Sequence, residues 1–173
     1  EIKSDKAHEE LQKICTANIK NEIGKCIYTH MLNPDGGIEA DLTVVCIDIN
    51  HFRIISSAAT RERDKFHIKK HLSQGIELKD VTDDYCVFGL FGPKSRKLMG
   101  SISKDDFDNN NFKFGTAKYI TIEGNKIWAQ RLSYVGELGF EIYVKFKDAK
   151  KIYELLIEKG KNFNLSNCGM HAM

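Results

Sequence analysis

The sequence Asn-Pro-Asp-Gly-Gly at residues 33–37 constrains the fold more than any other segment of the chain. The proline fixes its own φ angle, and the two glycines can adopt the positive φ that a tight turn requires. Residues 26–32 before it are rich in strand formers, and residues 38–48 after it alternate apolar and polar side chains. The pattern predicts a β-hairpin whose second strand projects Asp41 from the face opposite Leu42.

The rest of the chain predicts further strands, most of them joined by short turns, with helices between them. This arrangement predicts an α+β fold of mainly antiparallel sheets with interleaved helices. The expected strands are 52–56, 76–79, 85–91, 112–122, 126–133 and 140–146. The expected helices are 59–73, 93–101, 149–159 and one that runs from a cap at Ser4 to about Asn18.

Helix boundaries and buried faces follow from capping residues and apolar spacing. Ser4 and Asp148 are expected N-caps, Pro93 an expected first helical residue, and Gly75 and Gly160 expected stops. Within 59–73, the expected buried positions are Phe66, Ile68 and Leu72.

Length and composition indicate an ordinary globular chain. Its 173 residues are 42% hydrophobic and 29% charged, which predicts one domain over 1–173, with any subdivision near 76–84. Twenty-six basic against 24 acidic residues leave a net charge of +2, so neither nucleic acid nor an anionic membrane is expected as a main partner. No apolar run approaches the ~20 residues needed to span a bilayer.

Metal and disulfide chemistry find little support in the residue spacing. The five cysteines include no CxxC pair, so we expect structural thiols in a reducing compartment, with one reactive thiol as the alternative. His67 and His71 lie four residues apart, as metal ligands on a helix can. The segment between them lacks the glutamate of the HExxH motif and is cationic, so a solvated face is expected and no metal site is predicted.

Four motifs in order carry a family resemblance. They are Tyr-Thr-His-Met-Leu-Asn-Pro-Asp-Gly-Gly-Ile-Glu-Ala-Asp-Leu-Thr-Val at 28–44, the segment 52–64, the block 81–96 with Gly-Pro-Lys-Ser-Arg, and Arg-Leu-Ser-Tyr-Val-Gly-Glu-Leu-Gly-Phe-Glu-Ile-Tyr at 131–143. Together they resemble the aminomethyltransferase folate-binding domain family. That family includes the glycine cleavage T-protein and the C-terminal halves of dimethylglycine and sarcosine dehydrogenases. The resemblance covers roughly residues 5–173 and implies the family's folate-binding fold.

Two details resemble the dehydrogenase branch. T-proteins usually read YTGEDGFE where this chain has Tyr-Val-Gly-Glu-Leu-Gly-Phe-Glu at 134–141, and residues 168–173 resemble the segment before an Arg-bearing helix of that branch. The chain has no initiator Met and ends where that helix is expected to start, which predicts a piece of a longer protein. The resemblance implies FAD only in an upstream flavin dehydrogenase domain, and a bacterial cytoplasm or mitochondrial matrix as the location.

The resemblance also assigns site residues. Glu141 is expected to hold the pterin edge of tetrahydrofolate, because a carboxylate matches its adjacent N–H and NH₂ donors. Asp41, the second position of the family's Asp pair, is expected to be the catalytic carboxylate that stabilises a cationic one-carbon donor. Tyr28 and Tyr134 would line the cofactor pocket, and Ser57 stands where T-proteins often have Asn. The alternatives are that Asp41 and Glu141 are solvated surface carboxylates and that Tyr28 and Tyr134 are core residues. For Ser57, the alternative is that it makes no hydrogen bond to folate.

The expected function is therefore transfer of a methylene unit from an amine-derived intermediate to tetrahydrofolate. Two other functions stay open at this point. One is a non-catalytic regulatory or scaffold module, as in the phosphatase-regulatory branch of the family. The other is a stand-alone folate-dependent aminomethyltransferase or demethylase, acting on another methyl donor such as a sulfonium compound.

Overall fold

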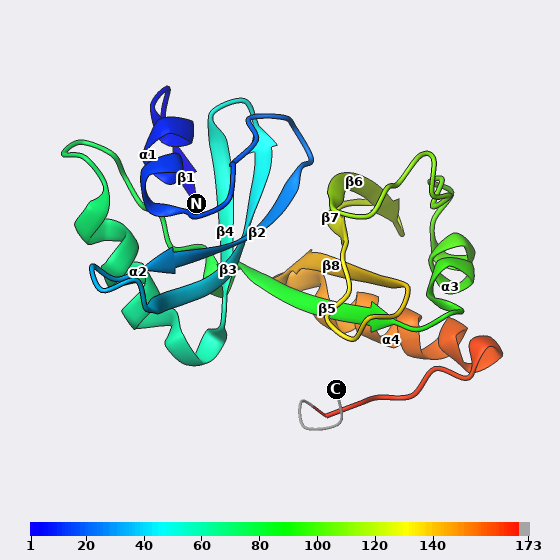
Figure 1. The fold of residues 1–173 in the computed structure, drawn as a ribbon. Coiled ribbons are helices and arrows are strands. Elements are labelled where there is room, and N and C mark those ends of the chain that lie inside the picture. Colours follow the sequence, from blue (N-terminus) through cyan, green and yellow to red (C-terminus); the bar gives the residue numbers. More distant parts are fainter. Residues whose placement is uncertain (170–173) are drawn as a thin grey trace. The chain divides into compact units, whose positions relative to one another are not determined.

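The computed structural model describes residues 1–169 and divides the chain into two compact units. The N-terminal unit is Glu1–Val81, and the C-terminal unit begins at Thr82. Each described unit contains a four-stranded antiparallel sheet with helices (Figure 1), which confirms the predicted α+β class. Residues 170–173, where the sequence predicts the start of a helix, lie outside the described residues.

The N-terminal sheet has the strand order β1-β4-β3-β2. The predicted hairpin is confirmed: β2 pairs with β3 so that His30 lies opposite Asp41. At the turn, the Asn33 side chain accepts hydrogen bonds from the amides of Asp35 and Gly37, at 3.1 and 2.8 Å. The strands are β1 (Ile2–Lys3), β2 (Cys26–Leu32), β3 (Ile38–Asp48) and β4 (His51–Ser56).

Two helices, α1 (Ala7–Ile14) and α2 (Arg61–His71), cover one face of this sheet (Figure 1). Leu11 and Ile68 join Leu42 and Val44 in its buried apolar core. The alternation of β3 turns Asp41 to the opposite face, where it is exposed. A short 3₁₀ turn, η1 (Ala58–Thr60), leads into α2.

The C-terminal sheet has the order β5-β8-β7-β6, and its helices also cover one face. Phe140 and Ile142 point into that core, where they meet helix residues such as Leu98 and Ile152. The elements are η2 (Thr82–Asp84), β5 (Tyr85–Phe91), α3 (Ser95–Ile102), β6 (Thr116–Ile122), β7 (Asn125–Arg131), β8 (Gly139–Lys145), η3 (Phe146–Asp148), α4 (Ala149–Gly160) and η4 (Lys161–Phe163).

The expected burial of Phe66 is wrong. Its side chain is 70% exposed, while Asp64 is 2% exposed and accepts a 2.6 Å hydrogen bond from the Thr60 hydroxyl. Asp64 and Ile68 are four residues apart and therefore share one helix face, and Phe66 between them points away. The hydrogen bond from Thr60 to the buried Asp64 carboxylate therefore determines which face of α2 points inward.

Several predicted element boundaries also differ. The strand expected at 76–79 is reduced to one bridge between Leu78 and Ile2. Pro93 lies in a turn, and α3 begins only at Ser95. Gly160 is the last residue of α4, and its φ of −62° is helical, so it is not a left-handed helix stop. Its lack of a Cβ instead makes room for the Leu165 side chain.

The cysteines divide into buried and accessible thiols. Cys15, Cys26 and Cys46 are buried, and burial raises the pKa of Cys15 to about 11, so its thiolate is scarce at neutral pH. Cys168 is exposed, so the expectation of a structural, packed thiol is wrong there. Among the described residues, no helix is long and apolar enough to cross a membrane.

Glu10 links α1 to the segment after α2, and we predict that it makes stability depend on pH. The carboxylate accepts from Lys13 at 2.6 Å and from the Ser73 amide and hydroxyl at 2.7 and 2.9 Å, and these bonds lower its pKa to about 2. Because the pKa of Glu10 is lower in the folded state, these bonds stabilise the fold at pH values above the unfolded pKa of about 4.3. This stabilisation is lost as the pH falls toward 2.

We expect Glu10→Gln to lower the melting temperature by several degrees at pH 7, and by much less at pH 2.5. Thermal unfolding followed by circular dichroism at pH 7, 5 and 2.5 measures this. Glu9→Gln is the matched control, because Glu9 is the neighbouring helix residue and lies outside this hydrogen-bond set. A difference between wild type and Glu10→Gln that stays constant with pH would contradict the prediction.

Candidate functional site

Three polar side chains meet on the helix-free face of the N-terminal sheet. Tyr28 donates its phenol proton to Asp41 at 2.8 Å, and its oxygen lies 3.2 Å from Nε2 of His30. Because the Tyr28 proton points to Asp41, the contact with His30 requires the Nε2–H tautomer. We call Tyr28, His30 and Asp41 the Asp41 cluster.

The strand register builds the Asp41 cluster. His30 lies directly opposite Asp41, and Tyr28 lies two residues before His30 on the same face of β2. His30 is not among the site residues predicted from the sequence. Counting outward from the turn would pair His30 with Ala40. A register shift between Met31 and Leu32 brings His30 opposite Asp41 instead, so the hairpin pattern alone does not find it.

Ser57 has a local structural role in the described residues. It follows β4 as the N-cap of η1, where its hydroxyl accepts from the Ala59 amide at 3.3 Å. The cap fixes the chain where it turns from the sheet toward α2. A folate contact of Ser57 stays a prediction.

A second carboxylate is positioned on the C-terminal sheet. Glu141 lies on β8 between Gln130 of β7 and Gly89 of β5, on the face away from α3 and α4. The Tyr143 hydroxyl, two residues along the same strand, donates to Oε2 of Glu141 at 2.8 Å. Among the described residues no other hydrogen bond to Glu141 is found, so Oε1 can accept from a ligand.

The face around Glu141 is polar and aromatic. Trp128 lies opposite Tyr143, and its ring meets Tyr119 of β6 edge to face at 4.8 Å. Trp128 is 4% exposed, and its Nε1 finds no hydrogen-bond acceptor in residues 1–169. A buried donor without an acceptor is costly, and a bound polar heteroaromatic molecule is one way to satisfy it.

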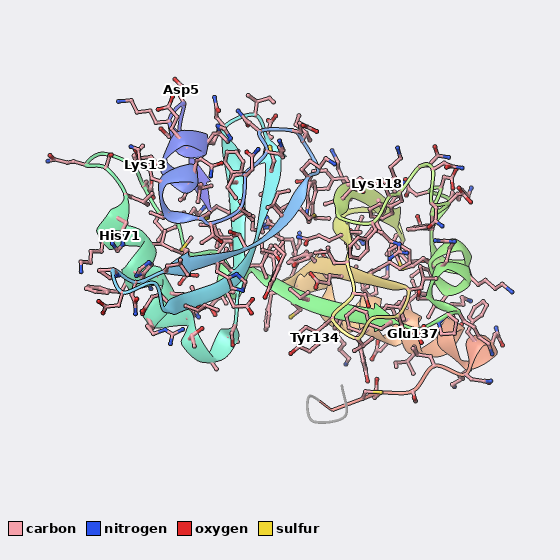
Figure 2. The ribbon with its side chains drawn as sticks, in the orientation of Figure 1. Asp5, Lys13, His71, Lys118, Tyr134 and Glu137 are labelled. Carbon is pink, nitrogen blue, oxygen red and sulfur yellow. The ribbon has the colours of Figure 1, made fainter. Side chains whose placement is uncertain are left out.

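Tyr134 stands apart from both carboxylates in the described hydrogen bonds. It lies in the loop between β7 and β8, with 80% of its side chain exposed, and Glu137 follows in the same loop (Figure 2). Gly136 turns this loop with a φ of 73°, a conformation that strongly favours glycine. The structure therefore pairs Tyr28 with Asp41 and Tyr143 with Glu141, and leaves Tyr134 free to contact a ligand.

Metal binding has no support among the described residues, where no group of three or more His, Cys, Asp or Glu side chains could hold an ion. His71 is exposed and His67 half-buried, and their rings lie 4.5 Å apart. Nδ1 of His71 instead bonds the His67 carbonyl at 2.8 Å, as expected for a helix surface.

Comparison with known proteins gives the family. The model of the GCVT N-terminal domain matches residues 1–173. The chain belongs to this family. It is 32% identical to an aminomethyltransferase of Halothermothrix orenii over 96% of the chain, and 31% identical to human mitochondrial dimethylglycine dehydrogenase over 91%. A 4-methylaminobutanoate oxidase (formaldehyde-forming) of Paenarthrobacter nicotinovorans is 30% identical over the whole chain.

These relatives are longer proteins: the matched region spans 46%, 18% and 21% of their respective lengths. Solved structures show the same fold. Glycine cleavage system aminomethyltransferase T from Bartonella henselae superposes with a TM-score of 0.74 at 22% identity, over 90% of this chain and 42% of that one. Heterotetrameric sarcosine oxidase from Corynebacterium sp. U-96 gives 0.71 at 13% identity, over 97% and 81%.

Gly139, just before the Glu141 position, tolerates no side chain. A Cβ there would meet the Phe91 ring and lie 2.7 Å from the Leu132 carbonyl oxygen. We therefore expect Gly139→Ala to lower the free energy of unfolding by ~1–3 kcal/mol, the usual cost of overpacking. Gly100→Ala, in α3 with open space around it, is the control and should stabilise by ~0.5–1 kcal/mol. Urea titration measures both, and equal effects would contradict the prediction.

Proposed function

We propose that this chain is the tetrahydrofolate-binding part of an enzyme that transfers a one-carbon unit from an amine-derived intermediate to tetrahydrofolate. The observation that carries the proposal is the Glu141 carboxylate, fixed by Tyr143 on a polar, aromatic sheet face. Membership of a family that contains aminomethyltransferases and dimethylglycine dehydrogenases supports it.

Glu141 would hold the pterin edge. The Tyr143 hydroxyl occupies one lone pair of Oε2 and orients the carboxylate, which leaves Oε1 and a second lone pair of Oε2 for the adjacent N–H and NH₂ donors. Charge-assisted pairs of this kind are stronger than neutral ones and fix the plane of the ligand. Nε1 of Trp128, buried without an acceptor in the described residues, is a further donor on this face.

Asp41 would act on the one-carbon donor. Tetrahydrofolate, when bound, supplies the nitrogens that accept the one-carbon unit. The Asp41 carboxylate orients the donor amine and stabilises positive charge that develops on it. Tyr28 keeps one carboxylate oxygen in place, and His30 can hold or pass a proton at the phenol oxygen.

The parent enzyme in this proposal is of the dimethylglycine or sarcosine dehydrogenase kind, with FAD in a separate upstream domain. The location is then a mitochondrial matrix or a bacterial cytoplasm. Similar identities to an aminomethyltransferase and to a dimethylglycine dehydrogenase keep a stand-alone transferase as the alternative. Full-length protein that oxidises dimethylglycine or sarcosine with reduction of bound flavin supports the first assignment.

Folate binding by Glu141 is tested by calorimetric titration of tetrahydrofolate into the full-length protein. We expect Glu141→Gln to weaken binding about tenfold or more, because one charged contact to a buried ligand edge is lost. Glu137→Gln, an exposed carboxylate of the preceding loop, should bind like wild type. Absence of binding by the wild type would overturn the proposed function and leave a scaffold or regulatory module.

Catalysis by Asp41 is tested by single-turnover formation of methylenetetrahydrofolate. We expect Asp41→Asn to slow transfer about 100-fold, typical for loss of one electrostatic stabiliser, with folate affinity nearly unchanged. Tyr28→Phe should give a smaller loss because the carboxylate remains. Asp48→Asn, at the exposed end of β3, is the control. Full activity in Asp41→Asn would remove this residue from the mechanism.

A further inference from the structure

Two glycines border Glu141 on the same face of the C-terminal sheet. Gly89 lies directly opposite it on β5, and Gly139 lies two residues before it on β8. Successive side chains alternate between faces, so both glycines and Phe91, which pairs with Gly139, share the Glu141 face.

The Phe91 ring fills the space that these glycines leave. A Cβ on Gly89 would lie 2.7 Å from Cε2 and 2.9 Å from Cζ of the ring, and a Cβ on Gly139 would meet its other edge. Real Cβ atoms do not approach carbon this closely, so side chains at either position would force the ring to move. The ring therefore lies along the sheet surface, with its tip over the residue directly opposite Glu141.

The outer side of the ring is accessible within the C-terminal unit. Phe91 is half-buried, so part of its ring surface is exposed. Opposite edges of the ring lie against the two glycine positions, which hold the ring beside the strand that carries Glu141. A flat apolar surface and a carboxylate are thus side by side.

We propose that Phe91 is the stacking platform for the pterin ring whose edge Glu141 holds. The inference rests on the proposed function, since it adds a second contact to the same ligand. A pterin lying parallel to the sheet would place its face on Phe91 and its donor edge at Oε1 of Glu141. Stacked aromatic pairs gain affinity beyond simple area burial, and they require a planar partner.

The test is calorimetric titration of the full-length protein with 6-methyltetrahydropterin and with tetrahydrofolate. We expect Phe91→Leu to weaken binding of both ligands by roughly three- to tenfold, the range of one aromatic pair. Phe91→Tyr keeps the plane and should bind like wild type. Phe88→Leu is the matched control, because Phe88 lies on the same strand but packs on the opposite face beside Tyr153.

Gly89→Ala tests the geometry without removing the ring. Its Cβ would displace Phe91, so affinity should fall as in Phe91→Leu, while circular dichroism confirms that the variant folds. One outcome would overturn the platform and keep the proposed function. In that outcome the wild type binds folate and Glu141→Gln abolishes binding, but Phe91→Leu and Gly89→Ala both bind like wild type. Absence of folate binding by the wild type would overturn both, and a loss in Phe88→Leu equal to that in Phe91→Leu would also overturn the platform.

Discussion

The register of antiparallel pairing is the constraint on which both carboxylate positions depend. In each unit the helices cover one face of a four-stranded sheet, and the apolar core on that face fixes which residues point inward. Leu42 and Ile142 point into their cores, so Asp41 and Glu141 must point away. A slip of one residue would exchange these faces and bury a carboxylate against apolar side chains, at a cost of several kcal/mol. Packing energy therefore determines where the charges lie.

The sheets were predictable because the alternation of apolar and polar residues that determines which side chains point inward is a local property of the sequence. The apolar alternation of β3 and the turn at 33–37 determine the hairpin without any distant contact, and the structure confirms it. Phe66 was not predictable in the same way. On hydropathy alone it belongs inside, but Asp64 occupies the inner face because the Thr60 hydroxyl satisfies it there. A buried hydrogen-bonded polar residue leaves no periodic apolar signal, so the helix rotation was misassigned.

The residues of the candidate site were named from the sequence, but their contacts were not. Family motifs drew attention to Asp41 and Glu141, while the hydroxyl that holds Glu141 comes from Tyr143, at the end of the same motif. Gly139 admits the Phe91 ring, a contact between strands that lie about fifty residues apart in sequence. Such a contact becomes visible only when the pairing of β5 with β8 is known.

Both carboxylates are oriented by a tyrosine hydroxyl, across the strands for Asp41 and along one strand for Glu141. A neutral donor has a consequence that an arginine or lysine would not have. It fixes one oxygen through a hydrogen bond but brings no opposite charge, so the full negative charge remains for a cationic amine or a ligand edge with N–H donors. A salt bridge would instead compete with the ligand for the same charge. Orientation by tyrosine thus suits a carboxylate whose partner arrives only when the ligand binds.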